Sequence, residues 1–148
     1  MIVEFQRVDQ YAKIPTRSNP SDAGLDVYAH IEDPVTIEPG ASVLIKTGLR
    51  FGVPHGYMLQ VMNRSSVAAK RSLVVGAHVI DSGYDGEVFI NLHNIGTKPQ
   101  AVYYGDKIAQ LVMVPVVTFR PQLVESKLYR HPITISDRGE GALGSTGE

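Results

Sequence analysis

The segment from Ile80 to Gly86 holds the side chain with the clearest chemical potential in this sequence. Asp81 stands between the apolar pair Val79-Ile80 and the turn residues Ser82-Gly83, so the chain fixes its position from both sides. A carboxylate held at the start of a hairpin can orient a water molecule and take its proton as the water attacks a phosphorus atom. Taken alone, Asp81 would more simply cap the turn, as Asp often does. The hydrolytic interpretation therefore depends on the residues elsewhere in the chain.

Other polar side chains have types and positions that suit a phosphate-bearing ligand. Arg64 and Ser65 stand at the start of a short helical pattern, where backbone N–H groups add to the guanidinium and the hydroxyl. Gln110 follows the turn Gly105-Asp106 and can donate a hydrogen bond from a strand. Taken singly, a surface ion pair for Arg64 and an exposed strand position for Gln110 are the better explanations.

The last eleven residues, 138–148, contain four glycines and almost no apolar side chains, so they cannot fold alone. We expect a flexible arm after a β domain that spans residues 1–137. A frayed terminus would explain the arm if it stood by itself. Its arginine, glycines and hydroxyls nevertheless occur in an order that suits wrapping around a phosphate, with Arg138 and the pair Ser145-Thr146 on the terminal phosphate.

The elements that must position these groups are short β-strands. Gly (14) and Pro (9) recur at short intervals, and the stretches between them are rich in Val, Ile, Thr, Tyr and Phe. The expected strands are Ser42–Lys46, Tyr57–Met62, Val88–His93 and Lys107–Val117, the last of which must stop pairing or reach an edge at Pro115. A short helix is expected through Val67-Ala68-Ala69, capped by Ser65 or Ser66. The pattern predicts an all-β domain, a jelly-roll-like sandwich or barrel.

Composition excludes several classes of protein. At 148 residues the chain suits one domain. Lys+Arg (14) and Asp+Glu (15) nearly cancel, so no nucleic-acid partner is expected. The sequence has no cysteine, no apolar run of the ~20 residues that a membrane span needs and no signal-peptide pattern. We therefore expect a cytoplasmic protein, in the host cytosol if viral, with no membrane partner.

Five segments occur in an order that resembles the signature motifs of the trimeric dUTP pyrophosphatases, or dUTPases. They are Ala23–Ala29, Arg64–Ser66, Val79–Glu87, Gly105–Leu111 and Arg138–Gly147. The resemblance implies a homotrimer whose sites lie between subunits, with the C-terminal arm closing over the nucleotide. It also implies hydrolysis of dUTP to dUMP and pyrophosphate. Mg²⁺ would be coordinated by phosphate oxygens and water, with no direct protein ligand.

The resemblance also implies roles for individual residues. Asp81 would orient the attacking water, and the ring of Tyr84 would lie under deoxyribose, leaving no room for a 2′-hydroxyl. Backbone near Ala77 to Ile80 would distinguish uracil from cytosine, and Leu143 would cover the base. The residues predicted to contact the nucleotide are Arg64, Ser65, Ser66, Ala77, His78, Val79, Ile80, Tyr84, Phe89, Gln110, Arg138, Leu143, Gly144, Ser145 and Thr146.

Some positions depart from the family pattern and keep two alternatives open. Gly83 and His78 stand where dUTPases commonly have Asp and Gly, and both also resemble dCTP deaminases, which share the fold. In deaminases the proton-transferring Glu lies on the strand after the hairpin, a place that Asn91 occupies here. Asn cannot exchange protons near neutral pH, so deamination is disfavoured. A nucleotide-responsive binding or regulatory protein of the same fold is the second alternative.

The remaining titratable residues suggest supporting roles. We expect Asp26 and Asp106 to brace turns or an arginine, and Glu87 to make a hairpin or subunit contact. The histidines show no spacing typical of a zinc site or a catalytic triad. His78 is the exception, because it lies inside the nucleotide hairpin and is predicted to line the pocket.

Overall fold

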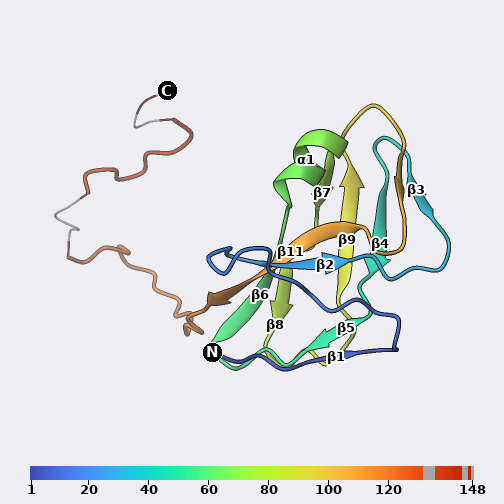
Figure 1. Cartoon of the computed structure of the whole chain (residues 1–148). Coiled ribbons are helices and arrows are strands. Elements are labelled where there is room, and N and C mark those ends of the chain that lie inside the picture. The colour runs from blue at the N-terminus through green and yellow to red at the C-terminus, as the bar shows by residue number, and fades with distance from the viewer. Residues whose placement is uncertain (132–135, 145–146, 148) are drawn as a thin grey trace. The chain divides into compact units, whose positions relative to one another are not determined.

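The computed structural model describes residues 1–131, 136–144 and 147. The chain divides into two units, Met1–Thr118 and Phe119–Glu148, and each is described by itself (Figure 1). Ser145 and Thr146, which are predicted to bind the terminal phosphate, lie outside the described residues. The proposed boundary between residues 137 and 138 lies within the second unit.

The first unit contains eleven strands and one short helix. In chain order they are β1 (Phe5–Arg7), β2 (Leu25–Tyr28), β3 (Val35–Ile37), β4 (Ser42–Lys46), β5 (Leu49–Phe51), β6 (Tyr57–Met62), α1 (Ser65–Arg71), β7 (Leu73–Val75), β8 (Val79–Asp81), β9 (Phe89–Asn94), β10 (Gln100–Val102) and β11 (Lys107–Pro115).

All strand pairs are antiparallel, and two sheets dominate the unit (Figure 1). One has the order β2-β11-β6-β8 and the other β4-β9-β7; β1 pairs with β5, and β10 with β3. Both larger sheets contribute side chains to one hydrophobic cluster, including Leu59 and Leu111 from the first and Ile45 and Ile90 from the second. This confirms the predicted all-β sandwich, while the described strands form no closed barrel.

The strand predictions are confirmed most closely for apolar runs that are bounded by turn residues or by proline. β4 and β6 have the expected bounds, and β9 starts one residue later than expected. β11 ends at Pro115, which has no N–H to donate to the ladder. The expected serine cap is wrong: Arg64 is the N-cap of α1 and makes no side-chain capping bond. Ser65 and Ser66 are already helical, so their hydroxyls are left for other partners.

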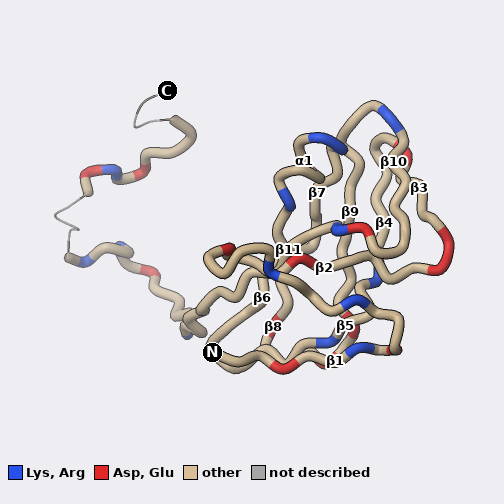
Figure 2. The backbone as a smooth tube through the Cα atoms, viewed as in Figure 1, with Lys and Arg blue, Asp and Glu red and all other residues tan. Residues whose placement is uncertain are grey.

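Charged residues of one sign are not gathered along any one part of the described chain (Figure 2). Lys and Arg are interspersed with Asp and Glu along the described trace, apart from the basic last turn of α1, Lys70-Arg71. No described helix is both long and apolar enough to cross a membrane.

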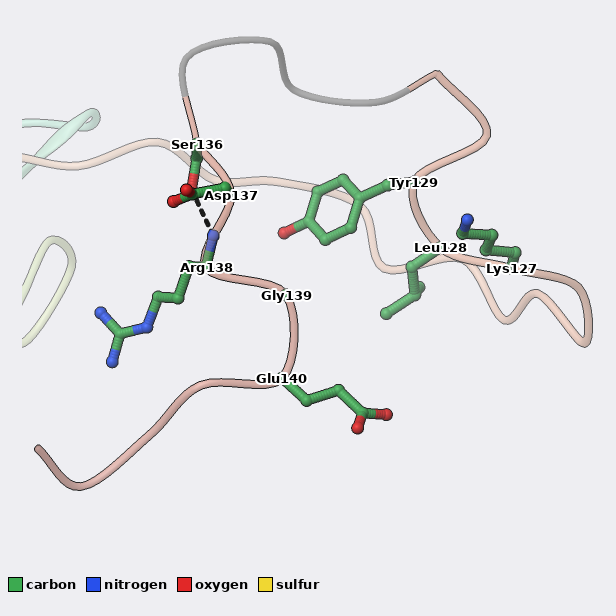
Figure 3. Close-up of a pocket in the computed structure, with 8 residues that line it drawn as sticks. All are labelled: Lys127, Leu128, Tyr129, Ser136, Asp137, Arg138, Gly139 and Glu140. Atoms are coloured by element: carbon green, nitrogen blue, oxygen red, sulfur yellow. Dashed lines mark hydrogen bonds between the residues drawn. The ribbon is translucent and has the colours of Figure 1, made fainter. Parts of the chain in front are cut away.

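The second unit has no helix or strand among its described residues. Lys127, Leu128 and Tyr129 line a hollow with the stretch from Ser136 to Glu140 (Figure 3). The backbone N–H of Arg138 donates to Ser136 Oγ at 3.4 Å, and its side-chain Nε donates to the Gly141 carbonyl at 2.7 Å. Leu143 is fully exposed, with a left-handed backbone like that of Gly144.

Candidate active site

A pocket of about 260 Å³ opens between β8 and β9, the two arms that flank the turn carrying Asp81. The hairpin expected from the sequence is wrong, because these two strands do not pair with each other. The arms belong to different sheets: β8 pairs with β6, and β9 pairs with β4 and β7. Because the arms are not hydrogen-bonded to each other, they leave space between them. The pocket is lined by Leu44, Ala77, Val79, Ile80, Asp81, Tyr84, Glu87, Val88, Phe89 and Asn91.

A tight turn places Asp81 and Tyr84 on the same pocket. The backbone N–H of Tyr84 donates to the Asp81 carbonyl at 3.3 Å, and Gly83 adopts φ +85° at the third position of this turn. That φ favours glycine, which explains why Gly83 stands there. Asp81 is exposed, and its carboxylate makes no hydrogen bond within the described part of the chain. It is therefore free to receive a ligand.

The ring of Tyr84 is held in place by the rest of the turn. Its hydroxyl donates to the Glu87 carbonyl at 2.8 Å. Gly86 lies so close to the ring that a Cβ there would overlap the hydroxyl. The ring is fixed at both ends and remains 45% exposed, so one face is available to the pocket.

Residues 47–50 join the turn to the body of the domain. Arg50 donates from Nε to the Asp85 carbonyl at 2.8 Å and from Nη2 to the Asp85 carboxylate at 2.6 Å. The Gly48 N–H donates to the Glu87 carboxylate at 3.2 Å. The Val88 carbonyl accepts from the Thr47 N–H at 3.2 Å, and the Val88 N–H donates to the Leu49 carbonyl at 2.8 Å. The turn is thus held on one side by charged groups and on the other by backbone hydrogen bonds to residues 47–49.

β8 is an edge strand, which leaves part of its backbone available. The His78 carbonyl accepts a hydrogen bond from the Val61 N–H at 2.9 Å, so this position faces β6. Alternation along a strand turns the N–H and C=O of Val79 to the opposite edge. Among the described strands only β6 pairs with β8, so no strand covers that edge. A flat polar ligand could bind there through backbone groups alone.

Asn91 closes the end of the pocket away from the turn. Its Oδ1 accepts from the Ala77 N–H at 3.3 Å and from His93 Nε2 at 2.9 Å, and its Nδ2 donates to the Val43 carbonyl at 3.3 Å. A Cβ on Gly76 would collide with both Asn91 and His93. Glycine at position 76 therefore makes room for this amide network.

A second, polar pocket of about 180 Å³ lies at the start of α1. It is lined by Ser18, Asp22, Asp26, Arg64, Ser65, Ser66 and Gln110. Arg64 Nε donates to Asp26 at 2.9 Å, and Lys107 Nζ lies 3.5 Å from the other oxygen of that carboxylate. Gln110 Nε2 donates to the Asn63 carbonyl at 2.9 Å. The expectation that Asp26 braces an arginine is confirmed.

The two pockets together contain most of the predicted contact residues. Ala77, Val79, Ile80, Tyr84 and Phe89 join Asp81 in the first, and Arg64, Ser65, Ser66 and Gln110 line the second. His78 is not among the lining residues, because its ring turns back to the Gly76 carbonyl, 3.2 Å from Nδ1. Arg138, Leu143 and Gly144 belong to the second unit.

The sequence did not identify several lining residues. Leu44 belongs to β4, which is distant in sequence from the hairpin. The sequence placed Asn91 where deaminases have a catalytic Glu, but it predicted only a hairpin or subunit contact for Glu87. Both residues line the pocket, and their even spacing, which puts them on the same face of an extended chain, was the available signal. Ser18 and Asp22 come from a loop without a strand pattern, so no periodicity marked them.

Within one chain the two pockets share no lining residue. Asp81 is paired with Met58 on one side of β6, and Gln110 is paired with Met62 on the other. Four residues along the strand and two strand spacings across the sheet separate their Cα atoms by roughly 16 Å. Hydrogen-bond reach is about 3 Å, so the two side chains cannot act on one atom in the same chain.

The described residues contain no group of three or more His, Cys, Asp or Glu side chains placed to hold a metal ion. In the polar pocket, the carboxylate of Asp26 is already paired with Arg64 and Lys107. Asp22 accepts from the backbone and side chain of Asn19. The side chains alone do not form a complete cation cage.

Comparison with known proteins identifies one family. The sequence profile of the dUTPase family matches residues 10–147. A deoxyuridine 5′-triphosphate nucleotidohydrolase of Gloeobacter violaceus is 40% identical over 147 residues, which cover 98% of this chain and 96% of that protein. A mutant Staphylococcus bacteriophage 80alpha dUTPase with dUpNHpp has a TM-score of 0.84 at 28% identity and covers 99% of both chains.

A mutant dUTPase from phage phi11 of S. aureus, whose structure describes the coordination of a structural Mg(II) ion, has a TM-score of 0.79 at 27% identity. The match covers 86% of this chain and 99% of that one. The family match spans both pockets and reaches into the C-terminal unit. The chain therefore belongs to the dUTPase family.

Proposed function

We propose that this protein hydrolyses dUTP to dUMP and pyrophosphate. The observation that carries the proposal is the turn from Asp81 to Tyr84, which puts a free carboxylate and a fixed aromatic ring on one pocket. The dUTPase relatives and the related structure with dUpNHpp support dUTP as the ligand.

Asp81 would orient the attacking water and take its proton. The water oxygen forms a bond to the α-phosphorus while the bond from this phosphorus to the bridging oxygen breaks, so pyrophosphate leaves. The exposed face of Tyr84 would lie under deoxyribose and exclude a 2′-hydroxyl. The outward N–H and C=O of Val79 suit the polar edge of a base, with Phe89 and Ile80 supplying apolar surface.

The polar pocket would hold the phosphates. Arg64 and Gln110 donate hydrogen bonds, and the hydroxyls of Ser65 and Ser66 are not used for capping the helix. Mg²⁺ bound to the triphosphate would neutralise charge that develops on the departing pyrophosphate. The side chains present suit such an ion carried by phosphate oxygens and water, with Asp22 and Asp26 nearby.

The distance between the pockets supports a site made from more than one chain. One copy would supply Asp81 and Tyr84, and another would supply Arg64 and Gln110, in the homotrimer that the family resemblance implies. Mixing an Asp81→Asn variant with an Arg64→Ala variant tests this directly. Denaturing and refolding them together should restore turnover by forming some sites with both native residues, whereas each variant alone stays inactive. No recovery from demonstrably mixed oligomers would contradict the shared site.

The activity itself is tested by incubating the protein with dUTP, dCTP, dTTP or UTP and Mg²⁺ and separating the products by chromatography. dUMP from dUTP alone is expected. Asp81→Asn should remove most turnover and leave nucleotide affinity largely intact. Asp33→Asn, the same change on an exposed loop outside both pockets, is the matched control. Near-normal turnover in Asp81→Asn would defeat the assignment.

Deamination is the alternative reaction for this fold. Asn91 lines the pocket at the position where the deaminase resemblance places Glu, and a carboxamide does not exchange protons near neutral pH. Formation of dUTP or dUMP from dCTP in the same assay would nevertheless identify that reaction. A stable oligomer that turns over none of the four nucleotides would favour a binding protein.

A further inference from the structure

We propose that Asn91 selects uracil over cytosine by donating its remaining N–H to the 4-carbonyl oxygen of the base. This inference rests on the proposed function, because it requires a pyrimidine nucleotide in the pocket between β8 and β9. It concerns a single side chain whose hydrogen bonds leave it only one way to interact with a ligand.

The position of Asn91 suits contact with the far edge of a base. Asp81 and Tyr84 lie at the turn end of the pocket, whereas Ala77 and Asn91 lie at the other end. Four residues of extended chain separate Ala77 from Asp81, a span of roughly 13 Å. A nucleoside whose sugar lies over Tyr84 therefore points the 4-position of its base towards Asn91.

The hydrogen-bonding capacity of the Asn91 carboxamide is nearly used up. Its oxygen accepts from Ala77 and His93, which occupy both lone pairs. Its nitrogen uses one of two N–H groups on the Val43 carbonyl. The other N–H has no partner within the described part of the chain, and Asn91 is a lining residue of the pocket. The side chain can therefore offer the pocket a donor but not an acceptor.

The network also prevents the amide from reversing this polarity. If the carboxamide rotated by half a turn, its NH₂ group would face the backbone N–H of Ala77, and its oxygen would face the Val43 carbonyl. The first contact would then bring two donors together, and the second would bring two acceptors together. His93 could change tautomer to adapt, but the Ala77 N–H and the Val43 carbonyl could not. The orientation is thus set by two backbone groups and reinforced by His93.

A fixed donor discriminates because the two bases differ in polarity at this position. Uracil presents a carbonyl oxygen, which accepts the hydrogen bond. Cytosine presents an amino group, which would leave two donors facing each other in a partly enclosed space. An unmade hydrogen bond of this kind changes specificity by roughly tenfold to a hundredfold. Asn91 thereby supplies side-chain discrimination beside the backbone groups of Val79.

Asn91→Asp is the sharpest test, since the shape is kept and the donor becomes an acceptor. We expect the ratio of kcat/KM for dUTP to that for dCTP to fall at least tenfold. Asn91→Ala should reduce the ratio through loss of uracil turnover. Gln10→Glu makes the same amide-to-acid change at an exposed residue outside both pockets and should leave the ratio unchanged.

His93→Phe keeps Asn91 and removes one of the two bonds that fix it. Its expected effect is a smaller loss of selectivity, severalfold, with the fold confirmed by circular dichroism. His93→Phe also provides a test of the inference if the proteins altered at Asn91 do not fold. An unchanged ratio in folded Asn91→Asp, or in His93→Phe if the former does not fold, overturns the inference. Failure of the unaltered protein to hydrolyse dUTP would instead overturn the proposed function on which it rests.

Discussion

Arg64 and Asp26 are joined by a direct hydrogen-bonded ion pair, with Nε 2.9 Å from Oδ1. The second oxygen of the same carboxylate lies 3.5 Å from Lys107 Nζ. One acidic group thus fixes two cations from different elements, and both Asp26 and Arg64 line the polar pocket. Lys107 belongs to β11, three residues before Gln110, so the carboxylate also connects the helix start to that strand.

Asp26→Asn should lower kcat/KM for dUTP by about tenfold, because a charge-assisted hydrogen bond that orients Arg64 is weakened. Steady-state kinetics measure this effect. Asp22→Asn is a matched control, since Asp22 lines the same pocket but bonds only to Asn19 within the described chain. Equal losses in the two variants would show that total charge matters and the contact with Arg64 does not.

Arg50→Ala should reduce the preference for dUTP over UTP several-fold. The two bonds from Arg50 to Asp85 hold the turn that carries Tyr84, and this ring is proposed to exclude the 2′-hydroxyl. Arg50 is partly exposed and Asp85 is 91% exposed, so the free energy of unfolding should change by less than about 1 kcal/mol.

The ratio of kcat/KM values for dUTP and UTP is the measurement for Arg50. Arg17→Ala removes an exposed arginine outside both pockets and serves as the control. A double-mutant cycle with Asp85→Ala should show non-additive effects on this ratio. Strict additivity would mean that the two residues do not act through their contact.

Gly83→Ala should destabilise the protein by about 1–2 kcal/mol, because φ +85° is unfavourable for a residue with a Cβ. Gly40→Ala is closely matched: φ is +81°, and in both places an added Cβ would meet nothing within 4 Å. Chemical denaturation should give similar losses of stability for the two variants. Only Gly83→Ala should also lower turnover, since it alone distorts the turn between Asp81 and Tyr84. Similar turnover in both would argue against a requirement for that turn geometry.

Local chemistry allowed prediction of the turn at Ser82-Gly83 and the end of β11 at Pro115, because glycine and proline change what the backbone can adopt or bond. The bounds of β4 and β6 were predictable because each is an apolar run between turn residues. Short strands such as β1 and β10 escaped prediction, since three residues carry little pattern and their partners are distant in sequence. The same cause hid the amide network of Asn91. It depends on which strands become neighbours, and that is decided by packing of the whole domain.

The Asp9–His30 pair predicts a pH dependence of stability. The hydrogen bond from His30 Nε2, 2.8 Å from the carboxylate, is the main cause that lowers the pKa of Asp9, and the Tyr11 N–H adds to it. A lowered folded-state pKa means that the stabilising contribution is present above the ordinary pKa of Asp. It is lost as the pH falls through the lower, folded-state pKa.

Asp9→Asn should therefore reduce stability at neutral pH, and the difference from the unaltered protein should shrink in strongly acidic solution. Urea denaturation of both proteins across a pH series measures it. Asp33→Asn, whose exposed carboxylate makes no hydrogen bond within the described chain, should show no such trend. A difference that stays constant from neutral to acidic pH would contradict the role of the Asp9 carboxylate.

Removal of residues 138–148 should abolish turnover and leave the β domain folded. The core residues all lie within Met1–Thr118, so thermal unfolding should change little. Arg138→Ala in the complete chain separates the loss of one cation from the loss of the arm. The size of the oligomer, measured by light scattering, should stay the same in both. Full activity of the truncated protein would show that turnover does not require the arm.

Because β8 and β9 belong to different sheets, a base bound between them would connect the two sheets of the sandwich. A ligand between these strands would contact both halves of the scaffold at once, so binding would restrain the spacing between them. Amides in β6 and in β4, which do not line the pocket through most of their length, should then exchange more slowly with solvent when nucleotide is bound. Binding in this one pocket would then both recognise the base and stiffen the domain.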